Sequence, residues 1–132
     1  MEGIIIFLQK IVIATVEGGD SQVDVEIKMV RNTLVIRVNG ELDMVMAEKL
    51  KKEMEARLDE GEVKNLIVNL EKVTFIDSSG LGVIIAGYKK VMAANGRMYI
   101  VGAKPNVKRI LILSGVSKLI PIYDTEQEVI NL

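Results

Sequence analysis

Two short, largely apolar runs separated by a helical pattern constrain the fold of this chain most. Residues 66–70 and 98–101 have the composition of strands buried on both faces of a sheet. Between them, apolar residues recur at steps of three and four over residues 79–94, which indicates a helix. A strand–helix–strand unit makes parallel neighbouring strands with a right-handed crossover. The sequence therefore predicts an α/β fold.

The residues before this unit predict a hairpin. Apolar and polar side chains alternate over residues 23–29 and again over 34–38, as they do in half-buried strands. Arg31-Asn32 between them fits a tight turn, because Asn tolerates a positive φ angle. A hairpin joined to parallel strands makes the sheet mixed.

Helices are expected after the hairpin and between the later strands. The first spans residues 44–59, with Asp43 at the N-cap position. The second is followed by a loop-forming Asn95-Gly96. The apolar face expected for this second helix consists of Leu81, Ile84, Ile85, Tyr88 and Met92.

The remaining residues predict two more helices and a last strand. Pro105 suits the first turn of one helix, and Thr125 with Glu128 forms a capping box for a final short helix. A short strand is expected over residues 120–123. The predicted order is β-β-α-β-α-β-α-β-α, a mixed sheet of four to five strands flanked by about four helices. We expect residues 23–132 to form this domain and residues 1–22 to form an N-terminal extension of uncertain structure.

The N-terminal extension does not have the sequence of a membrane anchor. Its apolar run over residues 3–16 is interrupted by Gln9 and Lys10, and it is shorter than the roughly 20 residues that a bilayer span needs. A signal peptide would have basic residues before the run, where this chain has Glu2. We therefore expect an extra strand or a short helix packed on the domain, or a poorly ordered tail, with a membrane or targeting role as the alternative.

The composition restricts the chemistry of the chain. It has no Cys and no His, and its formal net charge is −1. Without these residues it has no disulfide, no thiolate metal ligand and no imidazole base. A charge near zero provides no field that attracts nucleic acid. We therefore expect a chain that binds no nucleic acid and whose function needs neither an imidazole nor a thiol.

One segment carries a chemical signal, the loop predicted over residues 73–82 between a strand and a helix. It contains the motif Asp77-Ser78-Ser79-Gly80-Leu81-Gly82. The motif brings a carboxylate, two hydroxyls and two glycines to the free N–H groups of a helix N-terminus. Ligands and partners often bind at this end of a sheet.

Four interpretations of this segment are open. Asp77, Ser78 or Ser79 can cap the helix, with the glycines allowing close packing. A dinucleotide-binding turn is disfavoured, because Ile85 stands where the third glycine belongs. A nucleophilic serine is disfavoured by the absence of a His base. Phosphorylation of an exposed serine needs neither His nor Cys, because a second protein performs the chemistry.

Several blocks of the sequence together resemble one family. Gly40-Glu41-Leu42-Asp43, then Asn69-Leu70, then residues 75–83 with the serine motif, then Val107-Lys108-Arg109 and Ser114-Gly115 resemble the anti-sigma factor antagonists of the STAS domain family. The sporulation branch of that family, stage II sporulation protein AA, is the most similar. The resemblance covers about residues 23–132.

The resemblance implies a partner-switching function. The protein would be cytoplasmic, would not be an enzyme, and would have no metal, no cofactor and no membrane partner. The unphosphorylated chain would bind an anti-sigma factor that is also an ATP-dependent serine kinase, and so release a sigma factor. The kinase would phosphorylate Ser78 and end binding, and a PP2C-like serine phosphatase would reverse this. The partner-binding residues implied are Asp43, Asp77, Ser78, Ser79, Gly80 and Gly82. The alternatives are a STAS subunit of another assembly, such as a stress-signalling scaffold or a lipid-transport complex, and a small nucleotide-binding protein.

Overall fold

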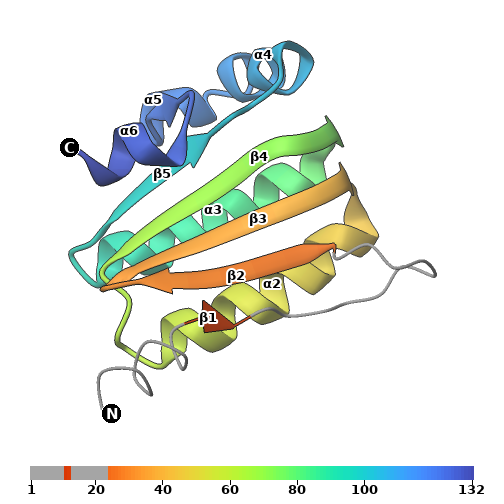
Figure 1. The fold of residues 1–132 in the computed structure, drawn as a ribbon. Helices are drawn as coiled ribbons and strands as arrows, with labels where there is room; N and C mark the ends of the chain where they lie inside the picture. Colours follow the sequence, from red (N-terminus) through yellow and green to blue (C-terminus); the bar gives the residue numbers. More distant parts are fainter. Residues whose placement is uncertain (1–10, 13–23) are drawn as a thin grey trace.

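The computed structural model describes residues 11–12 and 24–132, which form one mixed sheet with helices on both faces (Figure 1). The strands lie side by side in chain order. They are β1 (Ile11–Val12), β2 (Val25–Val30), β3 (Thr33–Leu42), β4 (Asn65–Ile76), β5 (Arg97–Val101) and β6 (Ile122–Tyr123). The pairs β1–β2 and β2–β3 are antiparallel, and the later pairs are parallel.

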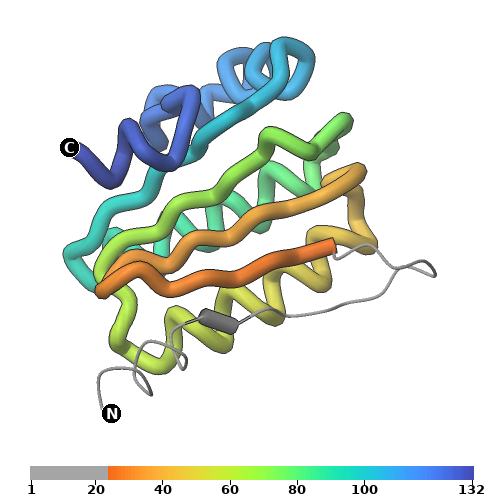
Figure 2. The backbone as a smooth tube through the Cα atoms, viewed as in Figure 1, coloured from red at the N-terminus to blue at the C-terminus, as the bar shows by residue number. Residues whose placement is uncertain are grey.

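The helices form a thick layer on one face of the sheet and a thin one on the other. They are α2 (Met44–Asp59), α3 (Ser78–Ala93), α4 (Pro105–Leu113), α5 (Val116–Leu119) and α6 (Glu126–Ile130). In Figure 2, α2 and α3 lie together behind the central strands. The larger hydrophobic cluster joins the sheet to α2, α3, α4 and α5. The smaller cluster joins the opposite face to α6 through Val129.

Alternation along the central strand β4 decides which cluster each residue joins. Leu66, Val68 and Leu70 belong to the larger cluster, whereas Ile67 belongs to the smaller one. Burial on both faces explains why this strand is an almost continuous apolar run. Asn69 interrupts the run and is the one buried polar side chain among the described residues.

The predicted order of elements is confirmed, with two additions. α2 spans the predicted residues, and Asp43 caps it as expected, because its Oδ1 accepts the N–H of Met46 at 3.0 Å. The additions are the strand β1 and the helix α5. The helix α5 has a single turn, which is too short to produce a periodic pattern. Apart from β1, the extension predicted at residues 1–22 lies outside the described residues.

Two local predictions are wrong. The sequence predicts a loop over residues 73–82, but residues 73–76 continue β4, because their backbone pairs with β3 as far as Leu42 opposite Ile76. The loop before α3 therefore consists of Asp77 alone. In the β2–β3 turn, the residue with the positive φ angle is Arg31, at 58°, and not Asn32.

The apolar face predicted for α3 is rotated from the observed one. The buried residues of α3 are Gly80, Val83, Ile84, Gly87 and Val91. Of the predicted residues, Ile84 is among them, and Leu81, Ile85 and Tyr88 are partly buried against the same core; Met92 is exposed. Gly87 allows the close approach of α2, since a Cβ there would lie 2.7 Å from the sulfur of Met54. A pattern that counts only apolar side chains misses a face made partly of glycine.

Gly96→Ala is expected to lower the free energy of unfolding by about 2–3 kcal/mol, because an added Cβ would overlap the backbone carbonyl oxygen of Lys64. Urea denaturation measures this difference. Gly82→Ala is the control, because a Cβ there meets nothing within 4 Å. An alanine at that exposed helical position should raise stability by about 0.5–1 kcal/mol. Equal stability of the two variants would contradict the packing described for Gly96.

Candidate functional site

The carboxyl ends of β3 and β4 lie side by side, and each leads directly into a helix. The strands are parallel and end with Leu42 opposite Ile76. Asp43 alone separates β3 from α2, and Asp77 alone separates β4 from α3. Two acidic N-caps therefore stand next to one another at the end of the sheet where α/β proteins tend to bind ligands and partners.

Asp77 is the residue that caps α3. Its Oδ1 accepts the backbone N–H of Ser79 at 2.9 Å and that of Gly80 at 3.1 Å. The sequence leaves the choice of cap open among three residues, and the structure resolves it in favour of Asp77. Two of the N–H groups at this helix N-terminus are therefore already bound to a carboxylate of the chain itself.

Ser78 is the first residue of α3, and its side chain is exposed. Its hydroxyl has no hydrogen-bond partner among the residues that the structure describes. Ser79, by contrast, is half-buried, and its backbone is held by Asp77. Of the two adjacent hydroxyls, that of Ser78 is the more open to a second protein.

Gly80 holds the start of α3, which is the corner of the fold that carries Ser78, against the end of β3. An added Cβ would lie 2.5 Å from the carbonyl oxygen of Leu42 and 2.8 Å from the side chain of Ile76. The same carbonyl oxygen accepts the N–H of Asp77 at 3.3 Å. These contacts join the corner that carries Ser78 to the strand end from which α2 starts.

Gly82 lies one helical turn after Ser78 and so shares its face of α3. It is exposed, and a Cβ there would meet nothing within 4 Å. The interpretation in which the glycines allow close packing therefore fits Gly80 but not Gly82. Gly80 also faces inward, so it does not offer its backbone to a pyrophosphate as a dinucleotide-binding turn would.

Sequence reasoning missed three exposed apolar residues close to this corner, Met44, Val45 and Phe75. A signal for them was present. Met44 and Val45 come before the buried residues of α2, which include Ala47, so they do not belong to the side of the helix that faces the core. Phe75 comes one residue before the buried Ile76, and alternation along a strand turns it to the other side.

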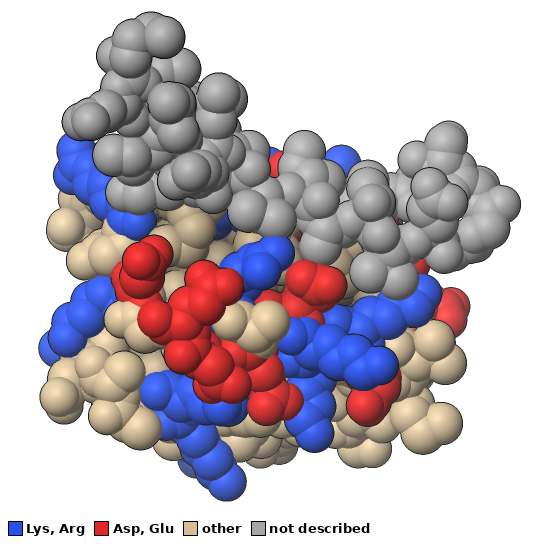
Figure 3. Space-filling view, turned by 90° about the horizontal axis from the view of Figure 1, so that it is seen from below, with Lys and Arg blue, Asp and Glu red and all other residues tan. Residues whose placement is uncertain are grey.

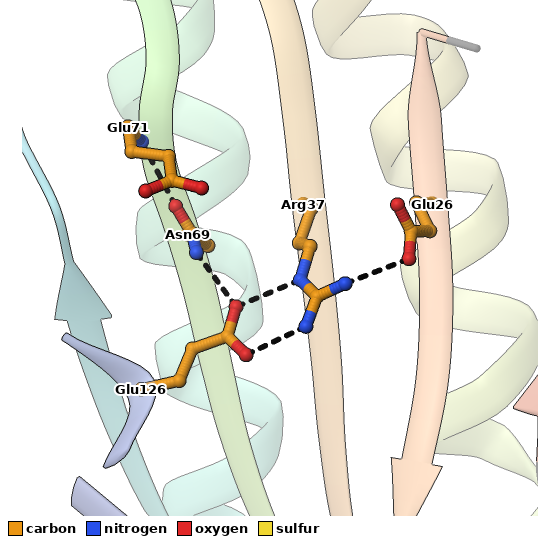
Figure 4. A network of polar contacts seen from close by, with 5 residues as sticks. All are labelled: Glu26, Arg37, Asn69, Glu71 and Glu126. Atoms are coloured by element: carbon orange, nitrogen blue, oxygen red, sulfur yellow. Dashed lines mark hydrogen bonds and ion pairs between the residues drawn. The ribbon is translucent and has the colours of Figure 1, made fainter. Parts of the chain in front are cut away.

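A polar network crosses the opposite face of the sheet, between β2, β3, β4 and α6 (Figure 4). Arg37 donates from Nε and Nη2 to the two carboxylate oxygens of Glu126, each at 2.8 Å, and from Nη1 to Glu26 at 2.8 Å. Asn69 donates from Nδ2 to Glu126 at 2.6 Å, and its Oδ1 accepts the N–H of Glu71 at 2.9 Å. No local sequence pattern indicates this network, because its partners are far apart along the chain.

The charges in this network stabilise one another. The hydrogen bond from Arg37 holds the pKa of Glu126 below its ordinary value, although burial acts in the other direction. The same hydrogen bond raises the pKa of Arg37. Glu126 is the first residue of α6, so the network anchors this helix to the sheet. A groove of about 640 Å³ lies beside it, but the network's charged groups are paired internally, which indicates a structural role.

The described part of the chain offers no arrangement of three or more acidic side chains that could hold a metal ion. None of its helices combines the length and apolarity needed to cross a bilayer.

Comparison with known proteins relates this geometry to one family. The model of the STAS domain matches residues 24–129. The anti-sigma F factor antagonist of Paenibacillus polymyxa is 34% identical over 102 residues, covering 77% of this chain and 87% of that protein.

Two solved structures of SpoIIAA are also similar to this chain. The unphosphorylated anti-sigma factor antagonist SpoIIAA is 30% identical with a TM-score of 0.66, covering 81% of this chain and 94% of that one. The phosphorylated form of the Bacillus cell fate determinant SpoIIAA is 30% identical with a TM-score of 0.68, covering 81% of this chain and 96% of that one.

Glu126→Gln is expected to lower the free energy of unfolding by about 1–2 kcal/mol at pH 7, because the charged pair with Arg37 is lost. The pKa of Glu126 in the folded chain lies below its ordinary value of 4.5. The contribution is therefore complete above that value and is lost as the pH falls through the folded pKa. Urea denaturation at pH 7 and pH 3 should show the difference from wild type shrinking at the lower pH.

The matched control is Glu62→Gln, which removes an exposed carboxylate that forms no ion pair with a described residue. It should unfold like wild type at both pH values. A Glu126→Gln deficit that does not change with pH would show that the carboxylate's charge is not what holds α6.

Proposed function

The chain belongs to the STAS domain family, and from this premise we propose that it is an anti-sigma factor antagonist. A relative that is 34% identical carries that name for the anti-sigma F factor, and SpoIIAA shares the fold at 30% identity. The observation that supports the proposal most strongly is the exposed hydroxyl of Ser78, which has no partner among the described residues and stands at the start of α3.

The proposed cycle alternates between two states in the cytoplasm. Unphosphorylated, the chain binds an anti-sigma factor and thereby releases the sigma factor. The anti-sigma factor is also a serine kinase, which moves the γ-phosphoryl group of ATP to the Ser78 oxygen; ADP leaves, and the hydroxyl proton passes to a base of the kinase. A PP2C-like phosphatase hydrolyses the phosphoserine. The chain itself needs no catalytic residue, so we propose that it is not an enzyme.

The capping geometry supports the off state of this cycle. A phosphate on Ser78 adds about 1.5 to 2 negative charges beside Asp77. The N–H groups of Ser79 and Gly80 are already bound to the Asp77 carboxylate and are not free to bind the phosphate. The added charge therefore projects towards the partner, close to two carboxylates, and opposes docking.

Each remaining residue of the proposed partner-binding set has a defined task. Asp77 caps the helix, and Ser79 supplies a backbone N–H to that cap. Gly80 holds the corner against Leu42, and Asp43 begins the neighbouring helix. Gly82 leaves bare helical backbone one turn from Ser78, where a side chain would stand between this chain and its partner.

Incubation with the anti-sigma factor and ATP, followed by mass spectrometry, should place a single phosphate on Ser78. Ser78→Ala should accept none and should keep its affinity for the anti-sigma factor in the presence of ATP. The matched control is Ser79→Ala, which removes the adjacent, half-buried hydroxyl and should still be phosphorylated. Phosphate at another residue, or full phosphorylation of Ser78→Ala, would disprove the assignment.

Ser78→Asp should weaken binding only in part, for example tenfold, where the phosphate abolishes it. A carboxylate carries about one charge, whereas a phosphate carries up to two and has three acceptor oxygens. Isothermal titration with the anti-sigma factor measures the affinity of wild type, Ser78→Asp and Ser78→Asn. The isosteric but neutral asparagine should bind more tightly than the aspartate, and equal affinities would show that size and not charge matters.

A further inference from the structure

The outer side of α4 carries exposed apolar side chains in line with exposed cations. Lys104, at the N-cap, is followed four residues later by Lys108 and eight later by Ile112, and Leu113 comes four residues after Arg109. Residues four apart share a face of a helix. Ile112 is 53% exposed and Leu113 is 76% exposed. We name these five residues the α4 surface.

The opposite side of α4 holds the helix in place. Val107 and Leu111 are fully buried in the larger hydrophobic cluster. The helix is therefore fixed to the domain by its inner side chains, and Ile112 and Leu113 are large apolar side chains that this packing does not use. Such side chains left open next to one another indicate an interaction site.

The charge around α4 has one sign. Between Asp77 and Asp124 the sequence has seven Lys and Arg residues and no Asp or Glu. The three cations of the α4 surface form no ion pair with any residue that the structure describes. A chain with a net charge of −1 thus concentrates unpaired positive charge on one segment, which favours an anionic partner.

The surface of α2 is different. On the face seen from below in Figure 3, acidic and basic side chains lie close together. On α2 some of them pair with one another, as Lys51 does with Glu55 and Arg57 with Glu53. In Figure 1, α4 lies beyond β5, on the other side of the molecule from α2. The unpaired cations of the α4 surface are therefore a local feature and not the character of the whole protein.

We propose that the α4 surface binds the face of a bilayer that contains anionic phospholipids. Lys104, Lys108 and Arg109 contact the lipid phosphates, and Ile112 and Leu113 enter the boundary between headgroups and acyl chains. The helix lies in the plane of the interface and does not cross the bilayer. Cations beside aliphatic side chains on the outer side of a helix are the pattern of such interfacial contacts.

An acidic protein segment would match the charge of the α4 surface but not its other features. Interfaces between proteins set their register with charges of complementary sign placed at particular points. They also take much of their affinity from Trp, Tyr and Arg anchors that fill pockets. The α4 surface has charges of one sign and two aliphatic side chains, which suit the diffuse negative charge of a lipid surface.

This inference goes beyond the proposed function and does not depend on Ser78. It also departs from the expectation of no membrane partner that the family resemblance implies. Strands β4 and β5 are parallel, so α3 and α4 start at the same end of the sheet. Ile112 and Leu113 stand in the last turn of α4, away from that end. A chain bound to a bilayer through them leaves Ser78 open to a second protein.

The test measures co-sedimentation of the full chain with two kinds of vesicle, one of phosphatidylcholine alone and one with an equal amount of phosphatidylglycerol. Wild type should bind the anionic vesicles at least about tenfold more tightly, because each Lys or Arg near an anionic surface contributes roughly fivefold. Raising the salt concentration should weaken binding, because salt screens exposed charges.

Two double variants separate the charged from the apolar contribution. Lys108→Glu with Arg109→Glu should reduce binding to the anionic vesicles at least about tenfold. Ile112→Ser with Leu113→Ser keeps every charge and should also reduce binding about tenfold, because the apolar insertion is lost.

Each double variant has a matched control with the same chemical change elsewhere. Lys52→Glu with Lys64→Glu reverses two exposed lysines that form no ion pair with a described residue. Met92→Ser with Ile130→Ser removes two apolar side chains of comparable exposure on α3 and α6. Both controls should bind within about twofold of wild type, and thermal unfolding should show all four variants folded.

Three results would overturn the proposal. The first is wild type that binds neither kind of vesicle, or both equally. The second is a loss of binding in the lysine control as large as in the Lys108 and Arg109 variant, because net charge and not the α4 surface would then decide. The third is a serine variant at Ile112 and Leu113 that binds like wild type, which would leave an acidic protein segment as the partner of these cations.

Discussion

The carbonyl oxygen of Leu42 is the point on which the site depends. It accepts the N–H of Asp77 and lies against Gly80, so it fixes the start of α3 to the end of β3. No residue other than glycine fits this contact without displacing backbone. The position of Ser78 is therefore set by the packing of two central strands and not by a flexible loop. The proposed partner would therefore meet the hydroxyl on a rigid surface, which lowers the entropic cost of docking.

The cap of α3 determines what a phosphate at Ser78 can do. In many proteins a helix N-terminus binds a phosphate through its free N–H groups. Here Asp77 already holds those of Ser79 and Gly80. In the proposed cycle, the same carboxylate would hold the serine in place for the kinase and would keep these two N–H groups from the resulting phosphate. The Asp77 cap thus accounts both for the stable fold of this corner and for the proposed sensitivity of its surface to added charge.

The sequence predicted the elements that local patterns determine. The span of α2 followed from its amphipathic pattern and from Asp43 as its cap. The place of the serine motif between a strand and a helix was predicted too, but the loop expected over residues 73–82 is reduced to Asp77. The buried face of α3 could not be predicted in this way, because glycines make part of it. The pair of Arg37 and Glu126 spans 89 residues, and only the tertiary fold brings it together.

The most direct test of this account compares the two phosphorylation states of the unmodified sequence. The chain is phosphorylated to completion on Ser78, and the affinity of each state for the anti-sigma factor is measured by isothermal titration calorimetry at physiological salt. The account predicts that the phosphate weakens binding at least a hundredfold while the thermal unfolding of the chain changes little. Equal affinities of the two states, with phosphate verified on Ser78, would contradict it.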